Sequence, residues 1–553
     1  MIDKSQDMFM LDSSNIAQLA KSNQQVIIIS DYYSHEIVAP NSWEKALFSE
    51  ICQIIGGSQP PKEYFINEPQ EGYIRLIQIR DYKTDKFATY IPIELAKRFC
   101  QKEDIMIGRY GPPIFQILRG LEGAYNVALM KAEPNTNLFD KEFLYYFLQT
   151  PQLFNYVASA SLRTAGQDGV RKELLDNYPV FVPPLNEQRR IVANIEALKA
   201  RSQRVKEELE AIAPLLDQFR QSVLAAAFRG DLTADWREKN PDVEPASVLL
   251  ERIRAERRRR WEEAELEKMK AQGKMPKDDK WKEKYKEPES VDDSQLPELP
   301  NSWCWAPVEL ISTKVVDGVH KKPNYVDDGI PFVTVKNLTA GSGISFDEIK
   351  YVSPEDHEEF VKRTNPERGD ILISKDGTLG VVRVVQTDRV FSIFVSVALV
   401  KPVTYKMSDY LEFAFSAPQM QRQMLGTGIG LMHIHLKDLR RYAVPVSPLI
   451  EQEEIVNRIN KHLRTIEKIS LNVDSNQKNC DQLDRSILAK AFRGELVPQD
   501  PNDEPASVLL ERIRAEREKL DTKKKAKGKT EKKSRKAKPE AAEPKQLSLP
   551  GFE

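Results

Sequence analysis

A duplication inside the chain constrains its fold more than any other feature of the sequence. The 14-residue string EPASVLLERIRAER occurs at 244–257 and again, unchanged, at 504–517. Three further strings recur in the same order: PNSW at 40–43 and 300–303, PLNEQRRIVANI and PLIEQEEIVNRI at 184–195 and 448–459, and AFRGDL and AFRGEL at 227–232 and 491–496. The offsets between copies are 260 or 264 residues, far longer than a solenoid repeat. The chain is therefore two tandem copies of one plan, for which a pseudo-twofold molecule is expected.

Each PL-x-EQ string opens a long stretch with an apolar heptad seam. The seam positions are Ile191, Ile195, Leu198, Ser202, Val205, Leu209, Ile212, Leu216, Phe219 and Val223 in the first copy, and Ile455, Ile459, His462, Ile466, Ile469, Val473, Asn476, Cys480, Leu483 and Ile487 in the second. Steps of four and three residues alternate over more than four heptads, which is typical of a coiled coil. Since the two seams have equal length, we expect the helices to pair with each other. The alternative is that each helix packs on its own domain.

Three polar seam positions and one proline qualify this pattern. Ser202, His462 and Asn476 weaken the seam and are candidates to set its register. Pro214 should kink or split the first helix near its end, because proline lacks the N–H that a helix interior needs.

The segments that precede these helices contain short β-rich runs. GYIRLIQIRDY, EDIMIGRYG and VFVPP lie within residues 41–180, and GIPFVTVKNL, GDILISKDG and VVRVV lie within residues 301–445. Turn signals separate the runs. Each segment is therefore predicted to be a compact α+β domain.

Charge is unevenly distributed along the chain. Residues 258–300 carry a dense run of Arg, Glu and Lys and end in the acidic EPESVDDSQLPELP, which indicates a solvated helix followed by a linker. Ten of the sixteen residues 523–538 are Lys or Arg, so the tail is expected to be disordered and to attract nucleic acid nonspecifically. With 82 basic and 83 acidic residues in total, the chain is not uniformly basic, but local basic patches remain possible.

Several features favour a soluble protein of the cytoplasm. Cys52, Cys100, Cys304 and Cys480 are far apart and form no CxxC pair. The start of the chain shows no signal peptide, and the longest apolar stretch, Val390–Val400, is too short to span a bilayer.

Sequence motifs for catalysis are absent. No Asn/Asp-Pro-Pro-aromatic loop or Gly-rich AdoMet-binding turn is found, and Gly528-Lys529-Thr530 has Lys523 where a P-loop needs glycine. His433 and His435 have no Cys or Glu-x-x-His partner nearby, so a metal site is not expected. The chain is predicted to perform no chemistry by itself.

The order and duplication of these motifs resemble a known family, the specificity subunits of type I restriction–modification systems. In the first copy the resemblance lies in the strings that span 41–60, 108–129 and 163–192, and in the second copy in those that span 368–385 and 426–456. It covers roughly residues 41–257 and 301–517. The first 40 residues, the insert after Arg257 and the basic tail depart from the family pattern.

The resemblance implies an α+β fold with two tandem target recognition domains, separated by two long helices that form an antiparallel coiled coil with pseudo-twofold symmetry. The expected segments are an N-terminal extension (1–40), recognition domain one (41–183), a central helical region (184–257), a charged helix and linker (258–300), recognition domain two (301–447), a C-terminal helical region (448–520) and a basic tail (521–553).

The resemblance also implies a division of labour on double-stranded DNA. Each recognition domain would read one half of a bipartite, asymmetric target, and the paired helices would fix the unread spacer. The helices would dock two methyltransferase subunits, which bind AdoMet and flip adenines for methylation. Restriction subunits driven by ATP, with Mg²⁺, would join them. The chain itself would be non-catalytic and would bind no cofactor or metal, in a bacterial or archaeal cytoplasm.

Candidate DNA contacts follow from side-chain chemistry, since Arg, Lys, Asn and Gln read base edges and hydroxyl or cationic groups bind phosphates. The candidates are Lys62, Tyr64, Arg75, Gln78, Arg80, Arg109, Tyr110, Arg163, Thr164, Gln167 and Arg171 in the first domain, and Lys321, Lys322, Asn324, Lys336, Asn337, Lys375, Thr378, Thr427, His433, His435 and Lys437 in the second. The strongest are the glycine-containing stretches 164–168 and 427–435. Asp376 is interpreted as a turn residue.

Two other functions stay open at this point. Duplication and heptads alone would also permit a coiled-coil scaffold without DNA specificity. An enzyme, such as a fused nuclease or methyltransferase, is disfavoured by the missing motifs.

Overall fold

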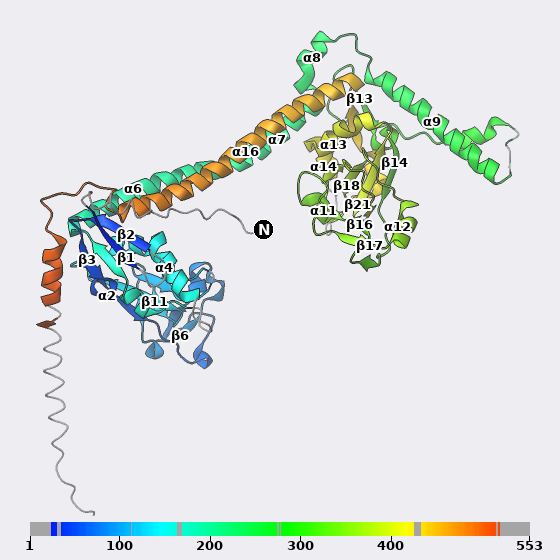
Figure 1. Ribbon diagram of the computed structural model, residues 1–553. Helices are drawn as coiled ribbons and strands as arrows, with labels where there is room; N and C mark the ends of the chain where they lie inside the picture. The colour runs from blue at the N-terminus through cyan, green and yellow to red at the C-terminus, as the bar shows by residue number, and fades with distance from the viewer. Residues whose placement is uncertain are drawn as a thin grey trace, which may run out of the picture. The chain divides into compact units, whose positions relative to one another are not determined.

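The chain forms two compact units, and each of them contains one α+β domain and part of the long helices (Figure 1). The computed structural model describes residues 24–29, 35–111, 113–162, 169–273, 276, 278–424, 433–515 and 518–519. The first unit comprises Met1–Glu208 and Asn476–Glu553, and the second comprises Leu209–Ser475. The first unit thus combines two segments that are distant in the sequence. The second unit is one continuous segment that begins and ends within the long helices.

The first domain has a strand pair and two four-stranded sheets. β3 (Glu44–Leu47) pairs with β12 (Pro179–Val182), which brings the start and the end of the domain together. One sheet has the order β4 (Cys52–Gly56), β11 (Leu129–Pro134), β8 (Ile105–Gly108), β9 (Gln116–Leu118). The other has the order β6 (Tyr90–Pro92), β5 (Tyr73–Ile77), β10 (Gly123–Tyr125), β7 (Phe99–Cys100), with β5 and β10 parallel.

Short helices complete this domain: α2 (Phe48–Ile51), α3 (Lys141–Leu148), α4 (Pro151–Leu162) and α5 (Lys172–Asp176). Before it, β1 (Gln24–Ile29) and β2 (His35–Pro40) form an antiparallel hairpin. Sequence analysis assigned no strands to this N-terminal extension.

The second domain repeats the plan. β13 (Cys304–Pro307) pairs with β22 (Ala443–Val446), and one sheet has the order β14 (Ser312–Asp317), β21 (Val397–Pro402), β18 (Ile371–Ser374), β19 (Val382–Val384). The other has the order β15 (Tyr325–Val326), β17 (Lys350–Val352), β16 (Ile330–Val333), β20 (Ser392–Ile393). Its helices are α10 (Val308–Ile311), α11 (Val335–Thr339), α12 (Pro354–Val361), α13 (Ser408–Ser416), α14 (Pro418–Met424) and α15 (Leu436–Arg441).

The backbone frames of the two domains correspond although their sequences differ. The order β4-β11-β8-β9 matches β14-β21-β18-β19, and the parallel pair β5–β10 matches β16–β20. Equivalent backbone hydrogen bonds recur in the two domains; for example, Gly57 N donates to Leu129 O and Gly318 N to Val397 O, both at 3.0 Å. Duplication has therefore preserved the frame while the side chains on it changed.

The helices predicted from the heptads are α6 (Leu185–Glu210), α7 (Ile212–Arg229) and α16 (Leu449–Ala491). The split at Ala211 confirms the effect expected of Pro214, because its ring would collide with the carbonyl of Glu210, where α6 ends. In the first unit Lys206 Nζ lies 2.7 Å from both Asp481 and Asp484 of α16. In the second unit the Phe219 ring of α7 packs edge-on against His462 of α16, with centroids 5.8 Å apart. The partner numbers fall as those of α6 and α7 rise, so the pairing is antiparallel.

The recurring strings of the sequence meet crosswise. Gly494, in the second AFRG string, has a φ of +73° and lies so close to Pro40 of the first PNSW string that a Cβ would overlap the proline ring. Gly230, in the first AFRG string, has a φ of +87° and lies equally close to Pro300 of the second PNSW string. Each domain is thus closed by the segment that follows the other copy's domain.

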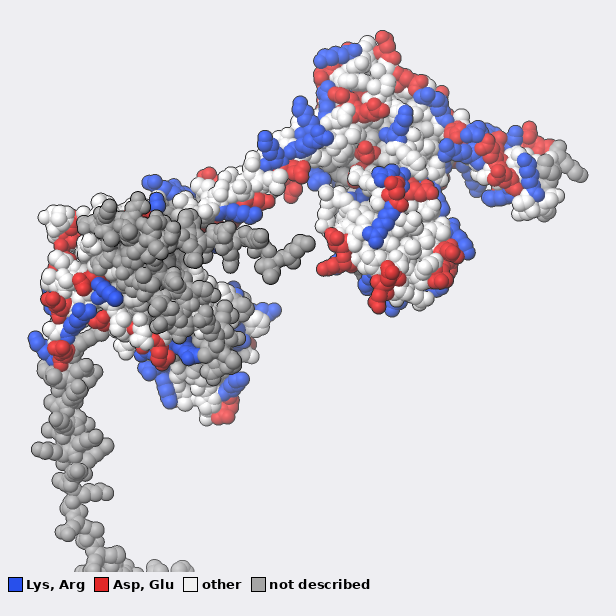
Figure 2. All heavy atoms as spheres, viewed as in Figure 1, with Lys and Arg blue, Asp and Glu red and all other residues white. Residues whose placement is uncertain are grey.

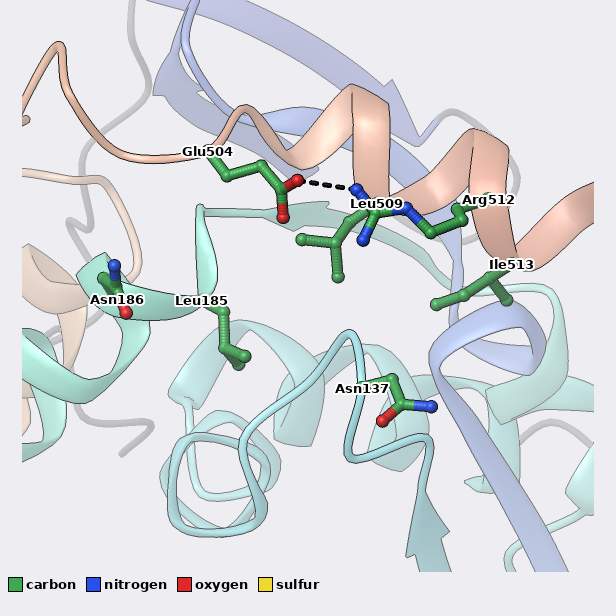
Figure 3. Close-up of a pocket in the computed structure, with 7 residues that line it drawn as sticks. All are labelled: Asn137, Leu185, Asn186, Glu504, Leu509, Arg512 and Ile513. Atoms are coloured by element: carbon green, nitrogen blue, oxygen red, sulfur yellow. Dashed lines mark hydrogen bonds and ion pairs between the residues drawn. The ribbon is translucent and has the colours of Figure 1, made fainter.

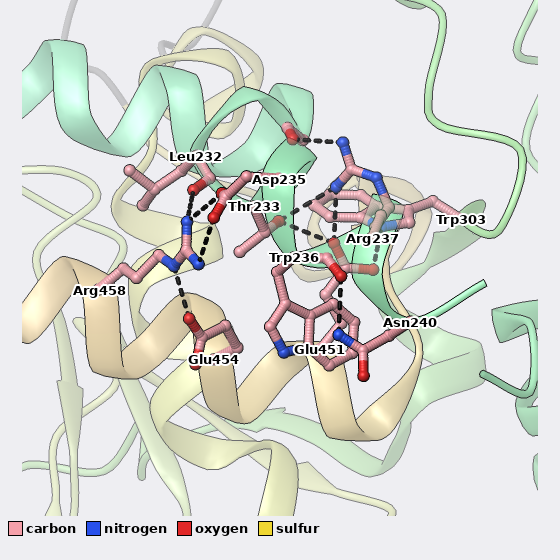
Figure 4. A network of polar contacts seen from close by, with 11 residues as sticks. Leu232, Thr233, Asp235, Trp236, Arg237, Asn240, Trp303, Glu451, Glu454 and Arg458 are labelled. Atoms are coloured by element: carbon pink, nitrogen blue, oxygen red, sulfur yellow. Dashed lines mark hydrogen bonds and ion pairs between the residues drawn. The ribbon is translucent and has the colours of Figure 1, made fainter. Parts of the chain in front are cut away.

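The buried glutamate of each PL-x-EQ string completes this closure. Trp43 Nε1 donates to Glu187 at 3.0 Å, and Trp303 Nε1 donates to Glu451 at 2.8 Å. Glu451 also accepts from Thr233 at 2.7 Å and from Arg237 at 2.6 Å (Figure 4). The PNSW, PL-x-EQ and AFRG strings recur in the sequence because one copy of each meets at each of two junctions, one in each unit.

The closing segment of the second unit contains η5 (Asp231–Thr233), α8 (Ala234–Lys239) and α9 (Ala246–Ala271). The helix predicted within the insert is the C-terminal half of α9. The predicted linker is more ordered than expected, since η6 (Asp279–Lys284) stacks Trp281 on Trp261 with centroids 6.1 Å apart. No helix among the described residues is long and apolar enough to cross a membrane.

Candidate nucleic-acid interface

The candidates of the first domain fall into two groups. Arg75 pairs with Asp85 at 2.7 Å, and Arg80 donates to the carbonyl of Phe87 at 3.3 Å. Gln78 donates to Thr89 at 3.3 Å. These three side chains therefore surround the segment between β5 and β6. The other candidates lie on separate loops; Lys62 and Tyr64 are exposed on η1 (Lys62–Tyr64), and Arg171 is exposed just before α5.

The second group forms what we call the β8 corner, defined as Arg109, Tyr110, Gly169 and Val170. Arg109 follows β8, and its carbonyl accepts a hydrogen bond from Val170 N at 3.0 Å. The Arg109 guanidinium donates to the carbonyls of Val170 and Val127, both at 3.3 Å, and lies over the Tyr110 ring. A Cβ at Gly169 would lie 2.6 Å from that ring, so a larger residue there would require the Tyr110 ring to shift. The phenol of Tyr110 is exposed.

The second domain has an equivalent corner with different side chains. We define the β18 corner as Lys375, Asp376, His433 and Ile434. Lys375 follows β18, and its carbonyl accepts from Ile434 N at 2.9 Å, as that of Arg109 does from Val170 N. Asp376 and His433 form a backbone bridge, and the Asp376 carboxylate bonds His433 Nδ1. The His433 and His435 rings meet edge to face, 4.7 Å apart.

A buried carboxylate, that of Asp317, pairs with Lys375 of the β18 corner. Asp317, the last residue of β14, is 4% exposed and pairs with Arg363, with His320 at 3.3 Å and with Lys375 at 3.6 Å. Burial alone raises the pKa of the Asp317 carboxyl, but the Arg363 hydrogen bond and the charges of Arg363, His320 and Lys375 outweigh it, so the pKa lies below its usual range. Asp317 is therefore an anion that fixes Lys375.

Two predicted base contacts need correction. Lys375 is 3% exposed, with its ammonium held by Asp317 and by Asp376 at 3.3 Å. Asn337 is 7% exposed; its amide accepts from Thr334 N at 2.9 Å and donates to Ser345 O at 3.1 Å. Neither side chain has a free edge to offer a base, because both are used in capping or charge pairing inside the domain.

The other candidates of the second domain are dispersed on its surface. The exposed ones are Lys321, Lys322, Asn324, Lys336, Thr378, His435 and Lys437. Thr378, His435 and Lys437 belong to the segments that carry the β18 corner. Arg163, Thr164, Gln167 and Thr427 lie outside the described residues, as does most of the two stretches that were the strongest predictions.

Sequence reasoning missed Asp317 and its partners Arg363 and His320. Asp317 is followed by glycine, so the pair has the form of an ordinary turn signal, and only the fold brings it beneath Lys375. Asp376 was interpreted as a turn residue, whereas its carboxylate holds a histidine.

The heptad residues are buried at the domain ends of the helices. Ile191, Ile195 and Ile487 join the core of the first unit, and Val223, Ile455 and Ile459 join that of the second. Leu198, Leu209, Ile212, Ile466 and Val473 are half-buried, whereas Val205, Phe219, Ile469 and Leu483 are exposed by more than a third. Both expectations thus hold in part, because the helices pair with each other and their ends also pack on the domains.

A groove lies where α6 of the first unit begins. Its volume is about 340 Å³, and it is lined by Leu185, Asn186 and Asn137 on one side and by Leu509, Arg512, Ile513 and Glu504 on the other (Figure 3). Glu504 and Arg512, on the same side of the groove, pair at 2.6 Å. The groove adjoins the second copy of the repeated 14-residue string.

Charges of both signs are interspersed on the visible face of the second unit, including α9 (Figure 2). Many of the arginines of α9 are neutralised by neighbours on the same helix, such as Arg259 by Glu256 and Glu263, each at 2.6 Å. Among the described residues no group of His, Cys, Asp or Glu could hold a metal ion.

Comparisons with known proteins agree with this architecture. A family model described as "Type I restriction modification DNA specificity domain" matches residues 40–212 and 319–473. The specificity subunits of the type I restriction enzymes EcoBI, from Escherichia coli, and EcoKI, from Escherichia coli strain K12, are each 26% identical to the chain. The matches cover 86% of the chain in both cases, and 93% and 96% of the two relatives.

A solved structure from a study of complex assembly and conformational transition of the type I R-M system has the same fold. It aligns with a TM-score of 0.56 over 83% of this chain and 99% of the solved chain, at 18% identity.

Proposed function

The chain belongs to the family of type I restriction–modification DNA specificity subunits, and we propose that its two domains divide one DNA target between them. It is the DNA sequence-recognition subunit of such a system. The domain of residues 41–183 reads one half-site and that of residues 301–447 reads the other. One observation carries the proposal: two equivalent frames hold different side chains at equivalent corners, as two readers of different sequences require.

The paired helices set the length of the unread spacer. They are continuous with both domains: α6 and α7 follow the first, and α16 follows the second. α16 contacts α6 at Lys206 in the first unit and α7 at Phe219 in the second, and a helix keeps its length, whereas a flexible linker would allow variable spacing.

Two methyltransferase subunits dock on the repeated helical parts. The 14-residue string is unchanged between its copies, yet of its described residues only Ala246, Leu249, Leu250 and Ile253, and their counterparts Ala506, Leu509, Leu510 and Ile513, are buried in the two units. The outer faces have different neighbours within the chain, since Arg254 pairs with Glu287 but Arg514 pairs with Glu50. Two copies of one partner, each contacting the same outer face, account for identity that internal packing does not require.

The chemistry belongs to the partners. AdoMet is bound by the methyltransferase subunits, ATP and Mg²⁺ by restriction subunits, and the chain itself is non-catalytic and acts in the cytoplasm of a bacterial or archaeal cell. The alternative of a scaffold without DNA specificity is not favoured, because the family is defined by DNA specificity.

Exchange of residues 41–180 for another recognition domain tests the division of labour. In the assembled methyltransferase, sequencing of methylated DNA should show one half-site replaced and the other unchanged. Alteration of both half-sites would contradict the proposal.

Shortening of the helices tests the spacer. Residues 215–221 of α7 and 460–466 of α16 face each other through Phe219 and His462. Removal of both heptads shortens the pair by about 10 Å at ~1.5 Å per residue, so the methylated target should have a spacer shorter by up to about three base pairs. An unchanged spacer would show that the helices do not set it.

Charge on the outer faces tests the docking. Val248 and Val508 are equivalent and 37% and 43% exposed. Val508→Glu should remove one methyltransferase subunit from the complex, and the double variant with Val248→Glu should remove both, as counted by native mass spectrometry. Val390→Glu, at a position 56% exposed on the second domain, is the control that keeps both. Retention of two subunits by the double variant would exclude this face.

A further inference from the structure

The two corners carry different polar side chains on equivalent backbone, and in the β18 corner the carboxylate of Asp376 holds the His433 ring. We propose that His433 contacts a base of the second half-site through Nε2, and that Asp376 is the positioning residue which orients its ring. The inference rests on the proposed function and goes beyond it by assigning a specificity-determining pair.

Equivalence of the corners is the first step. In both domains the residue after the central strand donates its N–H to the neighbouring strand's turn, Arg109 to Ala128 O and Lys375 to Ser396 O, both at 2.9 Å. In both, its carbonyl accepts from the segment that leads into the last helix, from Val170 N or Ile434 N. The frame is thus the same, so differences of side chain there have no origin in the fold.

The side chains at the corners differ in kind. The basic residue that follows the strand has different partners in the two domains. Arg109 donates to backbone carbonyls in the first, and Lys375 pairs with carboxylates in the second. The next residue is a tyrosine that packs across Gly169 in the first domain and an aspartate that bonds His433 in the second. Two domains that read different half-sites need such a position, with a constant backbone and interchangeable polar groups.

The bond from His433 Nδ1 to Asp376 fixes which atom of the ring is free. A carboxylate accepts only, so Nδ1 carries a hydrogen and Nε2 of the neutral ring is an acceptor. In the major groove an acceptor matches the amino group of adenine or cytosine. A neutral His433 ring would therefore select adenine or cytosine, the two bases that present an amino group in the major groove. His433 is about one-third exposed, which leaves an edge for that contact.

If Asp376 turned away from His433, the buried Lys375 would lose the nearer of its two carboxylate partners and keep only Asp317. The other oxygen of Asp376 lies 3.3 Å from Lys375 Nζ, and that lysine is 97% buried. Lys375, which itself contacts no base, thus anchors the carboxylate, and Asp317 anchors Lys375 from the other side. The series of contacts from Asp317 through Lys375 and Asp376 therefore fixes the orientation of the His433 ring.

The experiment uses the complete methyltransferase complex on a library of randomised targets, with methylated sites read by sequencing. His433→Ala and Asp376→Ala should each relax preference at the same single position of the second half-site, by about tenfold, since one base contact gives discrimination of this order. The double variant should be no worse than either single one, because Asp376 acts through His433. Asp376→Asn keeps an acceptor for Nδ1–H and should restore most of the preference.

Tyr110→Ala is the matched control in the first domain, and it should relax a position in the first half-site only. Hydrogen exchange of β18 and β19 reports whether a variant still folds. If Asp376→Ala loses methylation at every target and its β18 and β19 also lose protection from hydrogen exchange, that variant has not folded. The test then rests on His433→Ala, which leaves the Lys375–Asp376 pair intact.

The inference is overturned if the folded His433→Ala variant keeps the wild-type preference at every position, or if the double variant is worse than either single one. Absence of sequence preference in the wild-type complex would instead overturn the proposed function itself. The two failures are therefore distinguishable.

Discussion

Each junction of the molecule is built around one buried glutamate, and the two glutamates differ in their electrostatics. Burial raises the pKa of Glu187, although Trp43 and Gln499 donate to it and oppose the effect. Its neighbour Arg190 is engaged by Asp503 at 2.7 Å. Glu451, by contrast, has its own cation, Arg237, at 2.6 Å. The same residue type in the same motif therefore serves as an acceptor in one unit and as an ion-pair partner in the other.

Glutamine should separate these two roles. Glu187→Gln keeps the acceptor for Trp43 and removes a disfavoured charge, so the free energy of unfolding at pH 7 should stay the same or rise slightly. Glu451→Gln leaves Arg237 without its anion and should cost about 2 kcal/mol. Urea unfolding monitored by hydrogen exchange in β3–β12 and β13–β22 checks both. Equal losses in the two variants would contradict the distinction.

The lowered pKa of Asp317 predicts how stability depends on pH. A carboxyl whose pKa is lower in the folded state contributes stability above its unfolded value of about 3.8 and loses it as pH falls through the folded value. Asp317→Asn should therefore destabilise the second unit at pH 7, and the difference from wild type should shrink as the pH falls below about 4.

Asp388→Asn is the control for this prediction, since Asp388 pairs with Arg368 at 2.8 Å but is 78% exposed. Its effect on the urea midpoint should be small throughout, because exposed pairs contribute little. A penalty for Asp317→Asn that grows on acidification would show that the sign is wrong.

At the scale of elements, closure of each domain depends on a glycine that ends a helix. Gly230 is the C-cap of α7, and Gly494 follows α16 with φ of +73°. Glycine is needed at each position for two reasons. The left-handed backbone disfavours a side chain, and the facing proline leaves no space for one.

A comparison of two glycines separates strain from overlap. Gly72 has φ of +79° but nothing within 4 Å of an added Cβ, whereas Gly494 has φ of +73° and faces Pro40. Gly72→Ala should cost about 1 kcal/mol, from strain alone. Gly494→Ala should cost about 3 kcal/mol, because the closing segment must shift as well. Similar losses in thermal unfolding would show that contact with Pro40 is unimportant.

At the scale of the whole molecule, several residues between 487 and 513 belong to the first unit's core. Phe492 packs against Phe143 and Phe147 with centroids 4.9 and 5.6 Å away, and Leu509, Leu510 and Ile513 are buried in the same cluster. The second unit is closed by internal residues 230–257 instead. Among the described residues, the core of the second unit contains none from this C-terminal segment.

A chain that stops after residue 491 should lose stability in the first unit only. Burial contributes about 2 kcal/mol for each large aliphatic side chain, so loss of Leu509, Leu510 and Ile513 alone removes roughly 6 kcal/mol. Hydrogen exchange should rise in β3 and β12 but not in β13 and β22. A chain that stops after residue 519 is the control and should behave as wild type. Equal destabilisation of both units would contradict the crosswise closure.

The sequence by itself determined the duplication, the long helices and the family. Periodicity and repeated strings are local records of packing, so Ile191, Ile459 and the effect of Pro214 could be predicted without coordinates. The same holds for the general placement of β-rich domains before each helix, since strands and turns carry their own residue preferences.

Tertiary structure alone decided which copies meet and which polar residues are available. Nothing in the sequence indicates that Gly494 faces Pro40, or that Asp317 lies beneath Lys375, because these contacts join segments tens to hundreds of residues apart. The residue types in Asn337 and Lys375 suited base recognition, but burial committed both to internal partners. For Asp376 the difference is the reverse: the sequence indicated only a turn residue, whereas its carboxylate bonds His433 in the folded chain. A polar side chain's role depends on what surrounds it, and only the folded chain supplies those surroundings.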